Sequence, residues 1–248
     1  MIDALSVGGL YALAALGIGL IFGIMRLVNF AHGDLLMMGA YAMFMLAAAA
    51  WPLTILGGVV VAILVALVTE RIAFRPLRTA DPSVLLAASF AVSFFLQNFV
   101  LMVMGGRALG VDIVPVLNHH IAWGTLSISL LNLFTIGLSF VLMAALTLFL
   151  RHTQIGVNMR AASEDVRMAR MMGVRVNLVI AAAFAISGLL AGAAAIVVLG
   201  KTGLVLPAMG LRLTLVAFVA TVCGGMGSLT GAVIGGYAVG ILEVVLGG

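Results

Sequence analysis

The chain has 248 residues, of which 65% are hydrophobic and only 8% are charged. Soluble domains carry about 25% charged residues, so this composition excludes a soluble globular protein. Lipid requires backbone polar groups to be satisfied internally, and the apolar runs are continuous where a β-barrel would alternate. We therefore expect an all-α polytopic transmembrane helical bundle, with residues 1–248 forming a single domain.

The net charge is +4, from 12 Arg and Lys against 8 Asp and Glu. In a membrane protein such an excess reflects basic cytoplasmic loops, and we expect no nucleic-acid binding. The N-terminus has no basic region, and no small-residue cleavage site follows Ala4–Met25. This first apolar run is therefore interpreted as a retained span and not as a removed signal.

About eight membrane segments are expected, some of them short or broken. The apolar runs are Ala4–Met25, Leu35–Ala50, Leu53–Thr69, Ser83–Met104, Leu130–Leu150, Leu178–Leu199, Leu213–Cys223 and Ala232–Leu246. A straight span needs about 20 residues, so the second run is tilted, or broken and partly re-entrant. Gly-rich breaks at Asn29–Gly33 and Gly224–Gly231 flank short runs in opposite halves of the chain, an arrangement by which many transporters build a path near the midplane.

Two Arg-rich loops set the expected orientation. Glu70–Pro82 has three Arg, and Arg151–Asn177 has five Arg against two acidic residues. Two spans separate these loops, so the positive-inside rule places both in the cytoplasm and the N-terminus outside. The loops Gly105–Ser129 and Gly200–Arg212 are then expected to face outside.

The longest polar stretch, Gly156–Asn177, lies between two membrane spans and must be in water. Its composition favours a short helix that Gly173 stops, with Val166, Ala169 and Met172 on one face. Two interpretations stay open: a solvated helix that ties two spans together, or a docking helix for a soluble partner.

The sixth run is rich in small residues. Ser187, Ala191 and Ala195 form one row, and Gly188 and Gly192 form another. Small residues let helix backbones approach closely, so we expect this helix at the centre of the bundle.

No catalytic, metal or cofactor site is expected in this chain, and we expect no enzymatic activity. The stretch Ala195–Thr202 lacks the first Gly of a phosphate-binding loop and ends a membrane span. The pair His119-His120 has no acidic or Cys partners nearby. Paired ionisable residues in mid-span are scarce, which argues for an external energy source. Asp34 and Glu243 are interpreted as end-of-helix charges.

Three stretches together resemble ABC-importer permeases for branched-chain amino acids. The first is Gly23–Asp34 followed by Met38–Tyr41, which resembles the N-terminal signature of that family. The second, beginning Met159–Asp165, resembles its cytoplasmic loop. The third, Phe218–Gly236 with Gly240–Glu243, resembles its Gly-rich C-terminal region. The resemblance covers nearly the whole chain in the right order.

The resemblance implies a multi-pass permease subunit of a bacterial inner membrane. Its implied partners are a second homologous permease, forming a heterodimer, ATPase subunits that hydrolyse the ATP, and a periplasmic binding protein that delivers the amino acid. The implied coupling contacts are Arg160, Ala161, Ala162, Ser163, Glu164, Asp165, Ala169 and Gly173. The translocation path is expected at Asn29, His32, Gly33, Gly224, Gly225 and Gly227. Family members usually continue past Glu243 with a further span, which this sequence is expected to lack.

Several other functions stay open at this level. A urea or short-chain amide importer shares the same motifs. A stand-alone secondary transporter or channel would need no ATPase, but would be expected to have paired ionisable residues in mid-span. A non-transporting scaffold is the third alternative.

Overall fold

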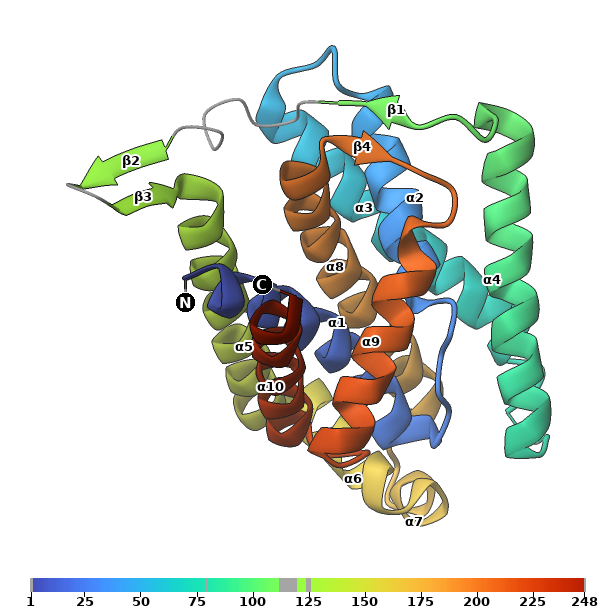
Figure 1. The fold of residues 1–248 in the computed structure, drawn as a ribbon. Helices are drawn as coiled ribbons and strands as arrows, with labels where there is room; N and C mark the ends of the chain where they lie inside the picture. The colour runs from blue at the N-terminus through green and yellow to red at the C-terminus, as the bar shows by residue number, and fades with distance from the viewer. Residues whose placement is uncertain (1, 79, 112–119, 124–125, 248) are drawn as a thin grey trace.

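The structure is a computed structural model that describes residues 2–78, 80–111, 120–123 and 126–247 (Figure 1). His119, one half of the His pair considered above, lies outside the described residues. In the described part, helices account for nearly all of the regular structure. This confirms the all-α bundle that the composition predicts.

Six helices are long and apolar enough to cross a membrane within the described residues: α1 (Ile2–Met25), α3 (Trp51–Thr69, continued by a π turn to Phe74), α4 (Pro82–Met104), α5 (Leu130–His152), α8 (Val176–Thr202) and α10 (Leu229–Gly247). Two shorter helices, α2 (His32–Met45) and α9 (Met209–Gly224), are too short to cross a membrane alone. Together with the six long helices, these two make up the eight expected segments. Two small helices, α6 (Gln154–Glu164) and α7 (Val166–Met171), connect α5 to α8.

Short strands occur at one end of the bundle, where the sequence predicted only mixed loops. Strand β1 (Leu109–Gly110) pairs antiparallel with β4 (Leu204–Val205), and β2 (His120–Trp123) pairs with β3 (Leu126–Ser129). Strands of two to four residues are too short for a two-residue periodicity to be recognised. The β1–β4 pair brings together the two loops that were expected to share the outer face (Figure 1).

The Arg-rich segments lie together at the opposite end. Arg78, which follows α3, donates a hydrogen bond to the side chain of Asn177 at the start of α8. At the β1–β4 end, Asn132 near the start of α5 donates to Asp3 of α1. The relative placement of loops and N-terminus therefore agrees with the positive-inside scheme, which assigns the Arg-rich end to the cytoplasm.

The centre of the bundle is formed by α1 and α8, whose residues are mostly buried, whereas α3, α4, α5 and α10 are largely exposed. On α8, a Cβ added to Gly188 would lie 2.8 Å from the Cα of Ile63, and one added to Gly192 would lie 2.9 Å from the Cα of Val59. The backbones of α8 and α3 therefore touch. The expectation of a central, closely packed sixth span is confirmed.

Candidate functional site

Two helices begin inside the bundle, and their first turns meet. A Cβ added to Gly33, in the first turn of α2, would lie 2.1 Å from the carbonyl oxygen of Gly210, in the first turn of α9. Helix α2 has 14 residues. At 1.5 Å per residue, its outer end therefore lies roughly 21 Å from this contact. The contact therefore lies deep in the bundle.

Polar groups gather around the start of α2. The Nδ1 atom of His32 lies 2.9 Å from the hydroxyl of Ser187 on α8, and the backbone N–H of Gly33 donates to the Thr214 hydroxyl of α9 at 2.9 Å. The His32 ring occupies the space beside Gly17, in the second half of α1, and Ser187 lies near the middle of α8. This polar cluster is thus level with the middle of the long helices, and all its side chains are buried.

Asp34 extends this cluster towards α4. Its carboxylate accepts a hydrogen bond of 2.9 Å from the Gln97 amide, and Gln97 also lies 3.1 Å from the hydroxyl of Ser93. Asp34 is only 1% exposed. It does lie in the first turn of α2, as an end-of-helix charge would, but that turn is in the interior. A carboxylate in such a place needs its hydrogen-bond partner, because an unpaired buried charge is costly.

A second charged group lies on α9 and α10. Arg212 and Glu243 form an ion pair of 3.0 Å, and Glu243 also accepts a hydrogen bond from the hydroxyl of Tyr11. The Arg212 side chain is 82% exposed. It is two residues beyond Gly210, so its backbone is also deep in the bundle. A guanidinium there is costly against hydrocarbon, so this face of α9 must meet water or protein.

The polar stretch between α5 and α8 forms two helices where the sequence predicted one, so that prediction is wrong in this detail. Asp165 breaks the helix, and its carboxylate caps α7 by accepting from the backbone N–H groups of Arg167 at 2.7 Å and Met168 at 3.0 Å. The predicted stop is correct: Gly173 has φ +87°, a left-handed conformation that favours glycine after a helix.

The expected apolar face of this stretch is also only partly correct. Ala169 is buried against the bundle, but Met172 is 84% exposed. Met168 and Met171 are exposed as well, so α7 and its C-cap residue Met172 present three methionines outward. The hypothesis of a docking helix applies to the exposed surface of α6 and α7, which we call the cytoplasmic docking surface for that reason. Exposed methionines are common on surfaces that bind other proteins.

The predicted coupling residues fall on both sides of these helices. Arg160, Ala161, Glu164, Asp165 and Gly173 are exposed, and Ser163 is partly exposed. By contrast, Ala162 and Ala169 are buried at 1% and 5% exposure, and they attach α6 and α7 to the bundle. Both helices are thus packed against the spans through these residues.

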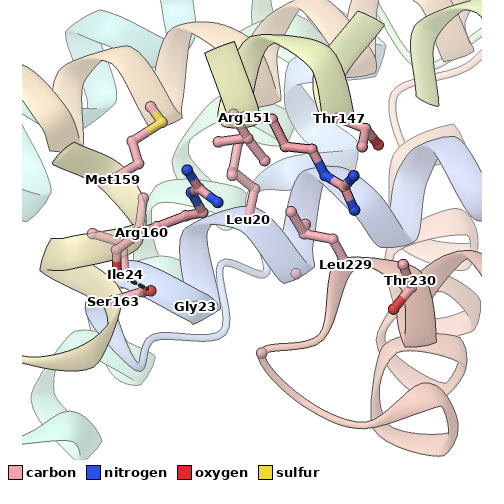
Figure 2. A pocket seen from close by; sticks show the side chains of 13 residues that line it. Leu20, Gly23, Ile24, Thr147, Arg151, Met159, Arg160, Ser163, Leu229 and Thr230 are labelled. Atoms are coloured by element: carbon pink, nitrogen blue, oxygen red, sulfur yellow. Dashed lines mark hydrogen bonds between the residues drawn. The ribbon is translucent and has the colours of Figure 1, made fainter. Parts of the chain in front are cut away.

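The predicted path residues form two separate groups. Asn29, His32 and Gly33 come together at the start of α2, and the Asn29 side-chain nitrogen has no partner within the described residues. Gly224, Gly225 and Gly227 lie at the turn between α9 and α10, at the Arg-rich end. There Gly227 lines a cavity of about 320 Å³, into which Arg151 and Arg160 extend (Figure 2).

Sequence reasoning missed three polar residues of these sites, Ser187, Thr214 and Arg212, and interpreted Glu243 only as an end-of-helix charge. Ser187 was assigned only to a small-residue row, and Thr214 lies in a run that looks uniformly apolar. Arg212 stands at a predicted loop end. A weak signal existed for Gln97, because a polar residue inside a span usually faces other helices or a cavity.

The fold and these sites define a class of protein. Eight membrane segments, two of them starting at a buried polar cluster, and two connecting helices packed against the Arg-rich end characterise a multi-pass membrane permease. The profile of the family described as "Branched-chain amino acid transport system / permease component" matches residues 1–248. The chain belongs to this family, and the family resemblance recognised in the sequence is confirmed.

Individual relatives agree with this membership. The chain is 33% identical over 260 residues to the high-affinity branched-chain amino acid transport system permease protein LivH of Escherichia coli, covering 99% of this chain and 84% of the relative. It is 32% identical over 259 residues to the corresponding protein BraD of Pseudomonas aeruginosa, covering 98% and 84%. A probable LivH of Methanocaldococcus jannaschii is 30% identical, covering 98% and 79%. No solved structure matches the chain.

The predicted localisation as a multi-pass protein of the inner membrane agrees with the six long apolar helices and with this family. A permease component is a part of a transport system, so further components are expected to work with it. The family is one of transport components, in agreement with the non-enzymatic role expected from the sequence.

Proposed function

We propose that this chain is the permease subunit of an ATP-driven importer of branched-chain amino acids. The relatives that are named for branched-chain amino acid transport match this chain over nearly its whole length. The structural observation that carries the proposal is the cytoplasmic docking surface. It exposes Met168, Met171 and Met172 and is fixed to the spans through Ala162 and Ala169.

The proposed partners follow from this surface and from the family. A pair of ATPase subunits binds α6 and α7. This chain itself binds no cofactor. ATP binding moves the ATPases between two states, and the shift acts through contacts that differ between these states. Arg160, Ala161, Ser163, Glu164, Asp165 and Gly173 are the proposed contact residues, while Ala162 and Ala169 transmit the motion inward.

The proposed path uses the two helices that begin inside the bundle. A periplasmic binding protein delivers the amino acid to the β1–β4 end. The amino acid then passes the cluster around Asn29, His32 and Gly33. The turn that holds Gly224, Gly225 and Gly227 lies at the cytoplasmic exit. A second homologous permease covers the face of α9 that exposes Arg212, which removes that guanidinium from lipid.

The docking surface is tested in the assembled transporter by changing Met171 and Met172 together to Glu. Losing two apolar contacts at an interface centre lowers leucine uptake by about tenfold or more. The level of the chain in the membrane stays the same, because both side chains are exposed. The control is Ile72→Glu, because Ile72 is an exposed apolar residue that lies outside α6 and α7, and it should leave uptake unchanged. Unchanged uptake in the double variant would contradict the proposed docking surface.

The solute is tested separately, with the unchanged transporter and its binding protein. Uptake of labelled leucine is expected to be inhibited by isoleucine and valine and unaffected by urea or acetamide. Inhibition by urea or acetamide alone would instead assign the chain to the amide importers. Uptake without ATP hydrolysis would favour a stand-alone transporter.

A further inference from the structure

A charged cavity and an apolar groove are continuous at the cytoplasmic end of the bundle. The cavity of about 320 Å³ lies between the end of α1, the end of α5, helix α6 and the start of α10. Figure 2 shows the side chains of Arg151 and Arg160 extending into it from α5 and α6. Its remaining lining is apolar or carries a hydroxyl, and no acidic residue is among the described residues that line it.

The two arginines have no charged partner within the described part of the chain. The ion pairs found there are Arg78–Glu70 and Arg212–Glu243. Two guanidinium groups that share one cavity repel each other unless an anion lies between them. A guanidinium presents paired N–H donors that fit two phosphate oxygens at once. The charged cavity therefore suits a phosphate group.

The apolar groove begins where the cavity ends. This hollow of about 430 Å³ lies between α5 and α10, over Leu16 of α1, and shares Thr147, Leu229 and Thr230 with the cavity. On α5, the residues Ala144, Thr147, Leu148 and Arg151 follow at helical spacing, so one exposed face runs from the groove to the arginine. Polarity therefore changes along this face, from apolar within the span to cationic at its cytoplasmic end.

We propose that this site binds an anionic phospholipid of the cytoplasmic leaflet. The phosphate lies between Arg151 and Arg160, and one acyl chain lies in the groove between α5 and α10. Anionic lipids are enriched in that leaflet, and basic pockets between transmembrane helices on this side are known to take their head groups. This proposal does not depend on the solute that the permease carries.

Other occupants fit less well. A soluble phosphate would use the arginines and leave the apolar groove exposed. A transmembrane helix of a partner would need an acidic residue at its cytoplasmic end, where the positive-inside rule favours Lys and Arg. A phospholipid matches both parts of the site, in the order in which they occur along α5. Since α6 belongs to the cytoplasmic docking surface, the lipid would tie that surface to α5 and α10.

The test is native mass spectrometry of the full chain, purified with the subunits that it retains. Phosphatidylglycerol and phosphatidylcholine with the same acyl chains are titrated separately. Each arginine near the membrane surface favours an anionic lipid by roughly fivefold, so the expected preference is about 25-fold. Changing both Arg151 and Arg160 to Gln removes it. The matched control changes Arg71 and Arg75 to Gln, because these exposed arginines at the same end do not line the cavity.

A second variant separates a lipid from a soluble anion. Ala144→Trp fills the exposed groove and leaves both arginines in place. It should weaken phosphatidylglycerol binding while leaving the weaker binding of glycerol 3-phosphate unchanged. Equal binding of the two lipids would overturn the proposal, as would an equal loss in the control variant. If Ala144→Trp leaves lipid binding undiminished, the two arginines bind a soluble anion and not a lipid. If residue 144 can be cross-linked to another subunit, the groove holds a helix of a partner.

Discussion

Arg212 and Glu243 form a 3.0 Å ion pair that joins α9 to α10, although 82% of the Arg212 side chain is exposed. Glu243 also accepts a hydrogen bond from Tyr11 of α1, so this one carboxylate links α10 to both α1 and α9. Two residues earlier on α9, Gly210 lies against Gly33 in the interior. An exposed charge so deep in the bundle indicates a face that meets water or protein.

Reversing this pair tests its role. Arg212→Glu places a carboxylate beside Glu243, and the repulsion is expected to lower leucine uptake by about tenfold or more. Adding Glu243→Arg restores opposite charges and should recover a substantial part of the uptake. Uptake is measured in cells that lack the native permease, with the membrane level of each variant determined in parallel. Full uptake in the single variant would show that the pair is dispensable.

The hydrogen bond between Gln97 and Asp34 is expected to stabilise the buried polar cluster. Gln97→Leu removes the donor and leaves the Asp34 carboxylate without this partner, at a cost of about 1–3 kcal/mol. Gln97→Glu should cost more, because it adds a second carboxylate. Asn98→Leu is the control, since Asn98 bonds to the carbonyl of Phe94 in its own helix. Thermal unfolding in detergent ranks the three variants, and equal midpoints would contradict this expectation.

Arg78 is expected to stabilise the cytoplasmic end of the bundle. It pairs with Glu70, which is 5% exposed, and donates to Asn177 of α8. Arg78→Met leaves the Glu70 charge buried and unpaired, which is expected to cost about 3–5 kcal/mol. Glu70→Gln combined with Arg78→Met removes the unpaired charge and should recover part of that loss. The thermal midpoint of purified protein is the measurement, and a double variant less stable than Arg78→Met would refute the explanation.

The contact between Gly33 and Gly210 leaves no room for a side chain. Gly33→Ala would place a Cβ 2.1 Å from the Gly210 carbonyl oxygen, so α2 and α9 must separate and folded protein should be strongly reduced. The control is Gly137→Ala on α5, where a Cβ meets nothing within 4 Å. It should be neutral or stabilise the helix by about 1 kcal/mol. Folded yield after size-exclusion chromatography compares the two, and equal yields would contradict the close approach.

The class of fold, the approximate membrane segments and the charge of the loops could be predicted from the sequence. These features depend on composition and on the lengths of apolar runs, which lipid constrains directly. The small-residue rows at Gly188 and Gly192 also predicted a central helix correctly, since close packing needs small side chains wherever it occurs. The family could be recognised because its motifs are local stretches in a fixed order.

The pairing of distant polar residues could be seen only in the folded structure. Asp34 and Gln97 are 63 positions apart, His32 and Ser187 are 155 apart, and Tyr11 and Glu243 are 232 apart. No local periodicity encodes such pairings, which arise when α2 and α9 begin inside the bundle. The division of the polar stretch at Asp165 was equally hidden, because the same residues suit one helix or two, and only the structure shows the Asp165 carboxylate capping α7.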